Sequence, residues 1–112
     1  MVQRAQLRSR LPVIISVEAE RDLEAIADYI AEDSPRAALK MIVDLRIRIS
    51  QIGESPLAFH ARPELGRDIR SSAFESYVIF YRATKTKVTI ARILHGAMDV
   101  TSVESTQTKS KK

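Results

Sequence analysis

The sequence predicts an α+β fold: an N-terminal strand, then an antiparallel helical hairpin packed on one face of a small, twisted, mainly antiparallel β-sheet. Three observations predict it. Residues 17–53 carry apolar side chains at helical spacing, interrupted by one proline. Residues 77–95 form two β-branched and aromatic runs around a short charged turn. The 112 residues suffice for one compact core but not two, so we expect a single domain over residues 11–100.

The N-terminal strand and the first helix follow each other directly. Residues 12–17 (PVIISV) form a β-branched run that is typical of a short strand. Ser16 can cap the helix that follows, and Glu18 and Glu20 suit the positive end of its dipole. A helix of about fourteen residues is expected from apolar residues at i, i+3, i+4 and i+7, namely Leu23, Ile26, Ala27 and Ile30.

A second helix starts at the turn formed by residues 32–35 (EDSP). Pro35 loses no hydrogen bond in a first turn, and Ser34 can cap the free amides. Gly53 is predicted to end this helix as a left-handed residue. The core-facing stripe consists of Ala38, Met41, Ile42, Leu45, Ile49 and Ile52. Outside this stripe lie Leu39, Val43 and Ile47, so we expect this helix to be covered on two sides.

The remaining chain is predicted to form an ordered loop and three strands. Residues 54–66 contain two prolines and read as a loop with one helical turn, followed by a short strand over residues 67–73. Residues 77–83 and 87–95 are strands joined by a tight hairpin. The first strand must therefore pair with a strand distant in sequence. We expect residues 1–10 to form a flexible extension and residues 101–112 a disordered polar tail.

Strict alternation assigns the side chains of the last two strands to the two faces of the sheet. One face receives Val78, Phe80 and Arg82 and the other Tyr77, Ile79 and Tyr81; along the last strand Val88, Ile90, Arg92 and Leu94 alternate with Thr89, Ala91, Ile93 and His95. Neither face is purely polar. We therefore expect the face away from the helices to be covered by a second copy of the chain or by another protein.

Composition and motifs exclude several classes of chemistry. The chain has no cysteine, which excludes disulfides, thiolate metal sites and cysteine nucleophiles. It has no glycine-rich phosphate loop, no HExxH and no GxSxG motif, so we predict no cofactor and no metal. The apolar run near the N-terminus is too short for a signal sequence or a membrane span. We therefore expect a soluble cytoplasmic protein.

The formal net charge of +4 is unevenly distributed. The tails, residues 1–10 and 101–112, together carry +5, so residues 11–100 carry −1. Residues 18–33 contain seven acids and one arginine, whereas residues 34–100 have a net charge of +5. These charges form either solvated faces or, in the later half, a cationic surface for an acidic partner.

The two histidines are distant from each other in sequence. His60 lies in a loop and is interpreted as a surface residue. His95 ends a strand beside Gly96, where the backbone can turn, and it is either a hydrogen-bonded structural residue or an acid–base group.

Five segments in succession resemble the ParE branch of the ParE/RelE toxin superfamily. They are A-x-x-D-L-x-x-I-x-x-Y-I-A from Ala19, S-P-x-x-A from Ser34, I-x-x-x-P from Ile52, Y-x-I-F-Y-R from Tyr77 and V-x-I-x-R-I-L-H-G from Val88. The likeness extends over roughly residues 13–99. It implies a toxin of a type II toxin–antitoxin pair, built as a helical hairpin on a small antiparallel sheet.

The resemblance implies two branches with different chemistry. RelE-like members cleave messenger RNA on the ribosome and need basic side chains to bind the scissile phosphate and to move a proton. Superposing this sequence on their pattern places Gly66 and Asp68 at two lysine positions, and Val78 and Met98 at two arginine positions. The usual catalytic set is therefore missing, and a carboxylate at Asp68 would repel a phosphate.

ParE-like members resemble the chain better, and this branch acts by poisoning DNA gyrase. The resemblance thus implies a binding protein rather than an enzyme, although many ParE-like chains carry arginine where this one has Met98. The residues predicted to bind the antitoxin or the target are Leu23, Ile30, Tyr77, Tyr81, Arg82, Arg92, His95 and Met98.

The implied partner is a cognate antitoxin, ParD-like or similar, with a DNA-binding N-terminal half, in a toxin–antitoxin hetero-oligomer without membrane association. Its C-terminal segment would lie on the helical hairpin and the exposed sheet, and the acidic first helix suits basic residues there. Two alternatives stay open. One is a RelE-like ribonuclease that uses Arg70, Arg82, Arg92 and His95; the other is a toxin-derived binding domain without activity.

Overall fold

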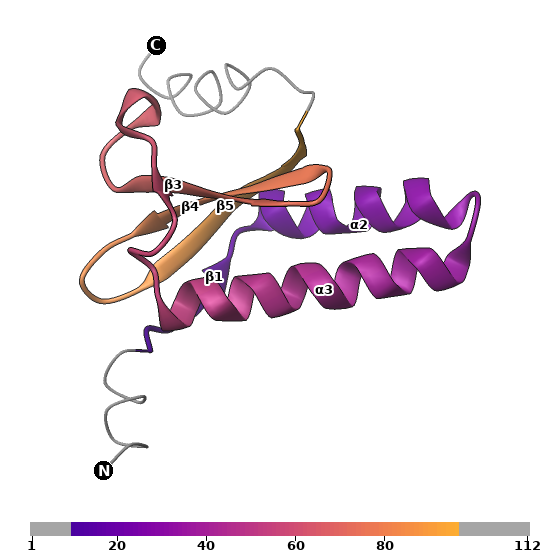
Figure 1. Cartoon of the computed structure of the whole chain (residues 1–112), viewed down its shortest axis with the longest axis horizontal. Coiled ribbons are helices and arrows are strands. Elements are labelled where there is room, and N and C mark those ends of the chain that lie inside the picture. Colours follow the sequence, from indigo (N-terminus) through magenta and orange to yellow (C-terminus); the bar gives the residue numbers. More distant parts are fainter. Residues whose placement is uncertain (1–9, 97–112) are drawn as a thin grey trace.

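The computed structural model describes residues 10–96 and confirms the α+β fold, with two helices against one face of a five-stranded sheet (Figure 1). The elements in chain order are β1 (Val13–Ile15), α2 (Val17–Ala31), α3 (Pro35–Glu54), β2 (His60–Ala61), the 3-10 turn η1 (Pro63–Leu65), β3 (Ile69–Phe74), β4 (Tyr77–Ala83) and β5 (Val88–His95). The sheet order is β1-β5-β4-β3-β2, with β1 parallel to β5 and the other pairs antiparallel. The predicted tail and all but residue 10 of the predicted extension lie outside the described residues.

Both helices begin where the sequence predicts, because a serine caps each one. The Oγ atom of Ser16 accepts the N–H of Ala19 at 3.0 Å, and the Oγ atom of Ser34 accepts the N–H of Ala37 at 3.1 Å. Each cap satisfies an amide that has no partner within its helix. Pro35 occupies the first turn of α3. Helices α2 and α3 pack side by side and run in opposite directions, which confirms the predicted antiparallel hairpin (Figure 1).

The predicted role of Gly53 as a left-handed helix end is wrong. Helix α3 continues to Glu54, and among the described glycines only Gly66 has a positive φ. A Cβ atom at position 53 would lie 2.5 Å from Cγ2 of Val13, and the Gly53 carbonyl accepts the N–H of Leu11 at 3.0 Å. Glycine is thus required because β1 passes directly against α3.

The predicted strict alternation along β5 is also wrong, because the strand contains a β-bulge. Phe80 pairs with Arg92 but Tyr81 pairs with Ile90, so Ala91 has no partner of its own on β4. One extra residue exchanges the two faces of a strand. As a result Ile90 and Ile93 both point into the core under the helices, while Leu94 lies on the opposite face.

The main core lies between the helical hairpin and the sheet. It contains Ala19, Leu23, Ile26, Leu45, Ile49, Ile52, Tyr77, Ile79, Tyr81, Ala83, Val88, Ile90 and Ile93. The other face of the sheet carries a smaller cluster formed by Leu65, Ile69, Phe80 and Leu94, with Val78 packed against it. The expectation of an external cover for this face is therefore wrong for this part of the sheet, because Leu65 of the preceding loop already packs there.

The outer side of α3 does not have the predicted second cover within residues 10–96. Leu39, Val43 and Ile47 are 67%, 48% and 51% exposed.

Neither α2 nor α3 is both long and apolar enough to cross a membrane.

Candidate functional site

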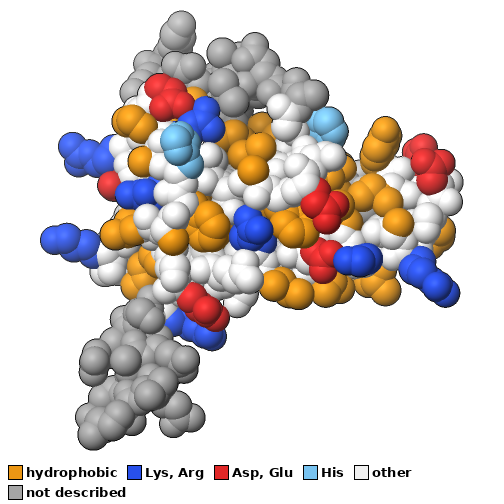
Figure 2. Space-filling model, in the orientation of Figure 1, with side chains coloured by type: hydrophobic (Ala, Val, Ile, Leu, Met, Phe, Trp, Pro, Cys, Tyr) orange, Lys and Arg blue, Asp and Glu red, His pale blue; other side chains and the backbone are white. Residues whose placement is uncertain are grey.

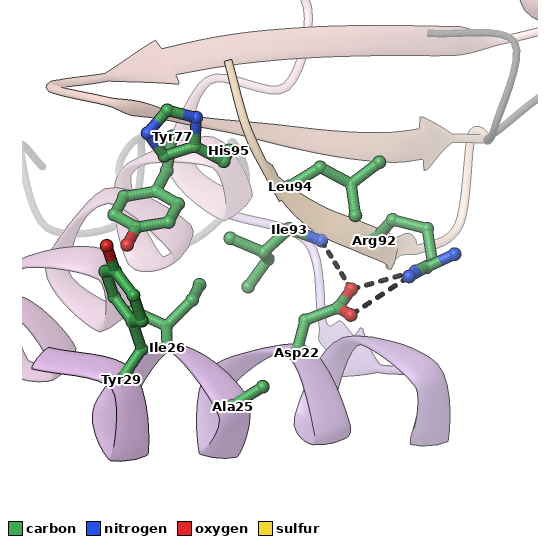
Figure 3. A pocket seen from close by; sticks show the side chains of 9 residues that line it. All are labelled: Asp22, Ala25, Ile26, Tyr29, Tyr77, Arg92, Ile93, Leu94 and His95. Carbon is green, nitrogen blue, oxygen red and sulfur yellow. Dashed lines mark hydrogen bonds and ion pairs between the residues drawn. The ribbon is translucent and has the colours of Figure 1, made fainter. Parts of the chain in front are cut away.

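An open groove of about 590 Å³ lies between α2 and one edge of β5 (Figure 3). Its lining consists of Asp22, Ala25, Ile26, Tyr29, Tyr77, Arg92, Ile93, Leu94 and His95. The groove exists because β1 pairs only with residues 88–90 of β5. Beyond Ile90, no described strand occupies this edge, and α2 stands beside it instead.

Asp22 closes one end of the groove and fixes α2 to the strand edge. Its carboxylate accepts two hydrogen bonds from the Arg92 guanidinium, at 2.8 and 3.1 Å, and one from the main-chain N–H of Ile93, at 2.8 Å (Figure 3). The hydrogen bond to Asp22 raises the pKa of Arg92. Asp22 therefore satisfies an edge amide that would otherwise lack a strand partner.

Two tyrosines and a histidine form the other end. The hydroxyl groups of Tyr29 and Tyr77 point toward one another in Figure 3. The rings of Tyr77 and His95 meet edge to face, with centroids 5.5 Å apart and planes at 86°. Burial, and secondarily the nearby Tyr29, raises the pKa of Tyr77. Tyr29 itself is 72% exposed, so a large aromatic surface is presented to solvent beside the groove.

The strand edge inside the groove presents the Ile93 carbonyl to a partner, because the Ile93 N–H is already bonded to Asp22. In an antiparallel strand, the N–H and C=O groups of one residue point to the same side, and alternate residues share that side. Because the N–H of Ile93 points into the groove toward Asp22, its carbonyl lies on the same edge. The floor between the polar ends is apolar, formed by Ala25, Ile26 and Ile93. Such an arrangement can bind an extended peptide.

The structure separates the residues that the sequence predicts to bind a partner. Tyr77, Arg92 and His95 line the groove together. Leu23 and Tyr81 are 3% and 0% exposed, so their predicted binding role is wrong: they are core residues. The remaining predicted binders are Ile30, which packs partly buried against the core, Arg82, which is exposed on β4 away from the groove, and Met98, which lies outside the described residues.

The four residues predicted for the alternative ribonuclease are not brought together. Arg70 is paired in register with Tyr81, on the helix-covered face of the sheet, and donates to the carbonyls of Leu57 and Phe59, at 3.4 and 2.8 Å. Arg82 is paired with Ile69, on the opposite face, and donates to the Arg67 carbonyl at 2.6 Å. Arg92 and His95 line the groove.

Asp22, Ala25 and Tyr29 are groove residues that sequence reasoning did not assign to a site. Asp22 and Tyr29 are seven residues apart, two turns of one helix, which places both on the same face as Ile26. This spacing is visible in the sequence and shows that Asp22 lies on an apolar helix face. The sequence does not show its partners, Arg92 and Ile93, because they belong to a distant strand of the sheet. No group of three metal-ligating side chains occurs in residues 10–96.

Comparison with known proteins agrees with this architecture. The family model of the ParE toxin of the type II toxin–antitoxin system parDE matches residues 13–100. Toxin RelE1 of Caulobacter vibrioides is 32% identical over 85 residues, which cover 75% of this chain and 91% of that protein.

Two solved structures share the fold. The chromosomal ParDE toxin–antitoxin system from P. aeruginosa gives a TM-score of 0.67 at 22% identity, covering 78% of this chain and 97% of that one. The toxin–antitoxin complex RelBE2 from Mycobacterium tuberculosis gives a TM-score of 0.54 at 24% identity, covering 80% of this chain and 94% of that one. The family model, matched over almost the whole described chain, and the relative with 32% identity show that this protein belongs to the ParE toxin family of type II toxin–antitoxin systems.

Proposed function

We propose that this ParE-family toxin acts by binding DNA gyrase in the cytoplasm, rather than by cleaving RNA, and that a cognate antitoxin neutralises it. The observation that carries the proposal is that the candidate catalytic arginines are already hydrogen-bonded within the protein and do not converge on one point. Each arginine considered for catalysis already donates to a carboxylate or to a main-chain carbonyl, and Arg70 and Arg82 lie on opposite faces of the sheet. A phosphate at a cleavage site needs several cations converging on one point.

The positions usual for RelE-type catalysis support the same proposal. Gly66 and Asp68 have φ values of 140° and 63°, and Val78 packs against the smaller apolar cluster. A carboxylate at position 68 disfavours a bound phosphate. The second arginine position, Met98, lies outside the described residues.

We further propose that the antitoxin occupies the groove between α2 and β5. An extended antitoxin segment would lie along the open edge of β5 and donate to the Ile93 carbonyl, since the Ile93 N–H is bonded to Asp22. Its apolar side chains would cover Ile26 and Tyr29. Helix α2, which forms one wall of the groove, is rich in acidic residues and therefore suits a segment that carries basic side chains. Both structural relatives are toxin–antitoxin systems, which supports a partner of this kind.

Messenger-RNA cleavage is the second candidate, because the relative from C. vibrioides is named Toxin RelE1 and the M. tuberculosis relative is a RelBE2 complex. Producing the chain without antitoxin, and then measuring gyrase supercoiling and message integrity, separates the two candidates. We expect inhibited supercoiling with intact messages. Cleaved messages with normal supercoiling would establish the ribonuclease, and no effect on either would favour an inactive binding domain. Met98→Arg should fold and leave messages intact.

Replacing Tyr29 by alanine is expected to weaken the complex with the antitoxin encoded beside this chain by about 10- to 100-fold. Tyr29 exposes 72% of its surface beside the groove, and buried aromatic contacts dominate interfaces of this kind. Isothermal titration calorimetry measures the change. The control is Leu57→Ala, which removes an apolar side chain of similar exposure, 70%, outside the groove. Equal affinities of the two variants would place the antitoxin elsewhere.

A further inference from the structure

Four exposed cations gather where the hairpin between β4 and β5 meets the loop before β3: Arg67, Arg82, Lys85 and Lys87, called here the hairpin-end patch. The Arg82 guanidinium donates to the Arg67 carbonyl at 2.6 Å, and the N–H of Ala83 donates to the Asp68 carbonyl at 3.0 Å. These two bonds hold the loop beside the strand. The patch therefore combines segments that are separated in sequence.

Among residues 10–96, none of the four patch cations forms an ion pair, whereas five of the nine other cations do. The five ion pairs are Arg10–Glu54, Lys40–Asp44, Arg46–Glu20, Arg62–Glu64 and Arg92–Asp22. No such pair involves a patch residue, although Asp68 follows Arg67 in the loop. Four cations with one neighbouring carboxylate leave a local positive charge.

Strand alternation places two of these charges, those of Arg82 and Lys87, on the face of the sheet away from the helices. Arg82 is paired with Ile69 and Thr89, and Ile69 belongs to the apolar cluster on the face away from the helices. Lys87 lies two residues before Thr89 and follows the same alternation. The turn between the strands is fixed, because the Thr84 N–H donates to the Lys87 carbonyl at 3.0 Å and the Lys87 N–H donates to Oγ1 of Thr84 at 3.2 Å.

Figure 2 shows Lys and Arg side chains projecting at the left margin, where Figure 1 places the turn between β4 and β5 and the loop before β3. The acidic residues of α2 belong to a different layer, the helical hairpin that covers the other face of the sheet. The hairpin-end patch is thus cationic and helix α2 is acidic. An anionic surface would attract the patch and repel α2, so the molecule would approach it with the patch first.

We propose that the hairpin-end patch binds the phosphate backbone of double-stranded DNA through Arg67, Lys85 and Lys87, while Arg82 holds the loop in place by its bond to the Arg67 carbonyl. Single-stranded nucleic acids are bound mainly through aromatic side chains on which the bases stack, and the patch contains only arginine, lysine and threonine side chains around its turn. Cations without stacking partners suit the regular phosphates of a duplex, without sequence preference. The inference deepens the proposed function, on which it rests, by giving the toxin a direct contact with the DNA that gyrase holds.

The test is fluorescence anisotropy of the full-length chain with a labelled 24-base-pair DNA duplex, measured without gyrase at several salt concentrations. The variant R67Q/K85Q/K87Q removes three exposed patch charges, and R21Q/R36Q/K40Q removes the same charge from the helical hairpin. The patch variant should lose about tenfold or more in affinity, and the slope of log affinity against log salt should fall by about 2–3. The hairpin variant should retain most of the affinity and slope of the parent chain.

Equal losses in the two variants would show that only net charge matters and would overturn the proposal. Tighter binding to a single-stranded RNA of equal length than to the duplex would overturn it as well, as would the absence of duplex binding by the parent chain. Circular dichroism confirms that both variants fold. The anisotropy assay contains no gyrase, so a lack of duplex binding would overturn this inference without affecting the supercoiling result. Conversely, if gyrase supercoiling is not inhibited, binding to the duplex can still be measured.

Discussion

Asp22→Ala is expected to lower the free energy of unfolding by about 3 kcal/mol, because it leaves the Arg92 guanidinium and the Ile93 amide without their acceptor. The side chains of Asp22 and Arg92 are only 14% and 24% exposed, so water replaces the lost carboxylate poorly. The value lies at the lower end of the range for buried ion pairs because some solvent still reaches both groups. Urea unfolding followed by circular dichroism measures it.

Two further variants test this explanation. Asp22→Asn keeps an acceptor for the Ile93 amide but loses the charge, so its cost should be about half that of the alanine variant. Glu24→Ala removes an exposed carboxylate from the same helix and should change stability by less than about 0.5 kcal/mol. If Asp22→Ala proved no more destabilising than Glu24→Ala, α2 would not be fixed to β5 through this carboxylate.

Tyr81→Ala is expected to cost about 4 kcal/mol, because it empties the space of a fully buried ring in the centre of β4. Tyr81→Phe keeps the ring and loses the hydrogen bond from the hydroxyl to the Pro56 carbonyl, which is 2.6 Å long, so its cost should be about 1–2 kcal/mol. Urea unfolding separates the two effects. Equal costs for the two variants would contradict the assignment of Tyr81 to the core.

The same hydroxyl predicts a dependence on alkaline pH. Burial raises the pKa of Tyr81 to about 12, whereas the unfolded chain releases this proton near its ordinary value of 10. The folded state therefore binds the proton more tightly, and the contribution to stability is complete below about pH 10 and is lost as the pH rises toward 12. The stability difference between the parent chain and Tyr81→Phe should shrink over this interval. A constant difference would contradict the shift.

Features that depend on neighbours in sequence could be predicted without the structure. The caps at Ser16 and Ser34, the proline that starts α3 and the apolar helical spacing each involve residues within one or two turns. The pairing of the first strand with a distant one also followed, because a lone strand before a helical hairpin needs a partner in the sheet. The resemblance to the ParE branch used the same local motifs, and the family match confirms it.

Features that depend on contacts across the fold could not be predicted. The bulge at Ala91 exchanges the faces of β5, so Ile93 and Leu94 take sides that simple alternation does not give them. Gly53 looks like a helix end in the sequence, yet its role is set by Val13, forty residues earlier. The binding role predicted for Tyr81 failed for the same reason, since only packing decides whether an aromatic strand residue is buried.

The sequence by itself determined the fold class, the helical hairpin and the family, because helix caps, apolar periodicity and motifs each depend on residues that are close together in the chain. Only the tertiary structure decided which residues share a surface. Asp22 and Arg92 are seventy positions apart and meet across the groove, whereas Arg70 and Arg82 are close in the sheet but face opposite sides. The physical reason is that a side chain's partners, and hence its remaining capacity to bind, are fixed by strand pairing and by the packing of layers rather than by the local chain.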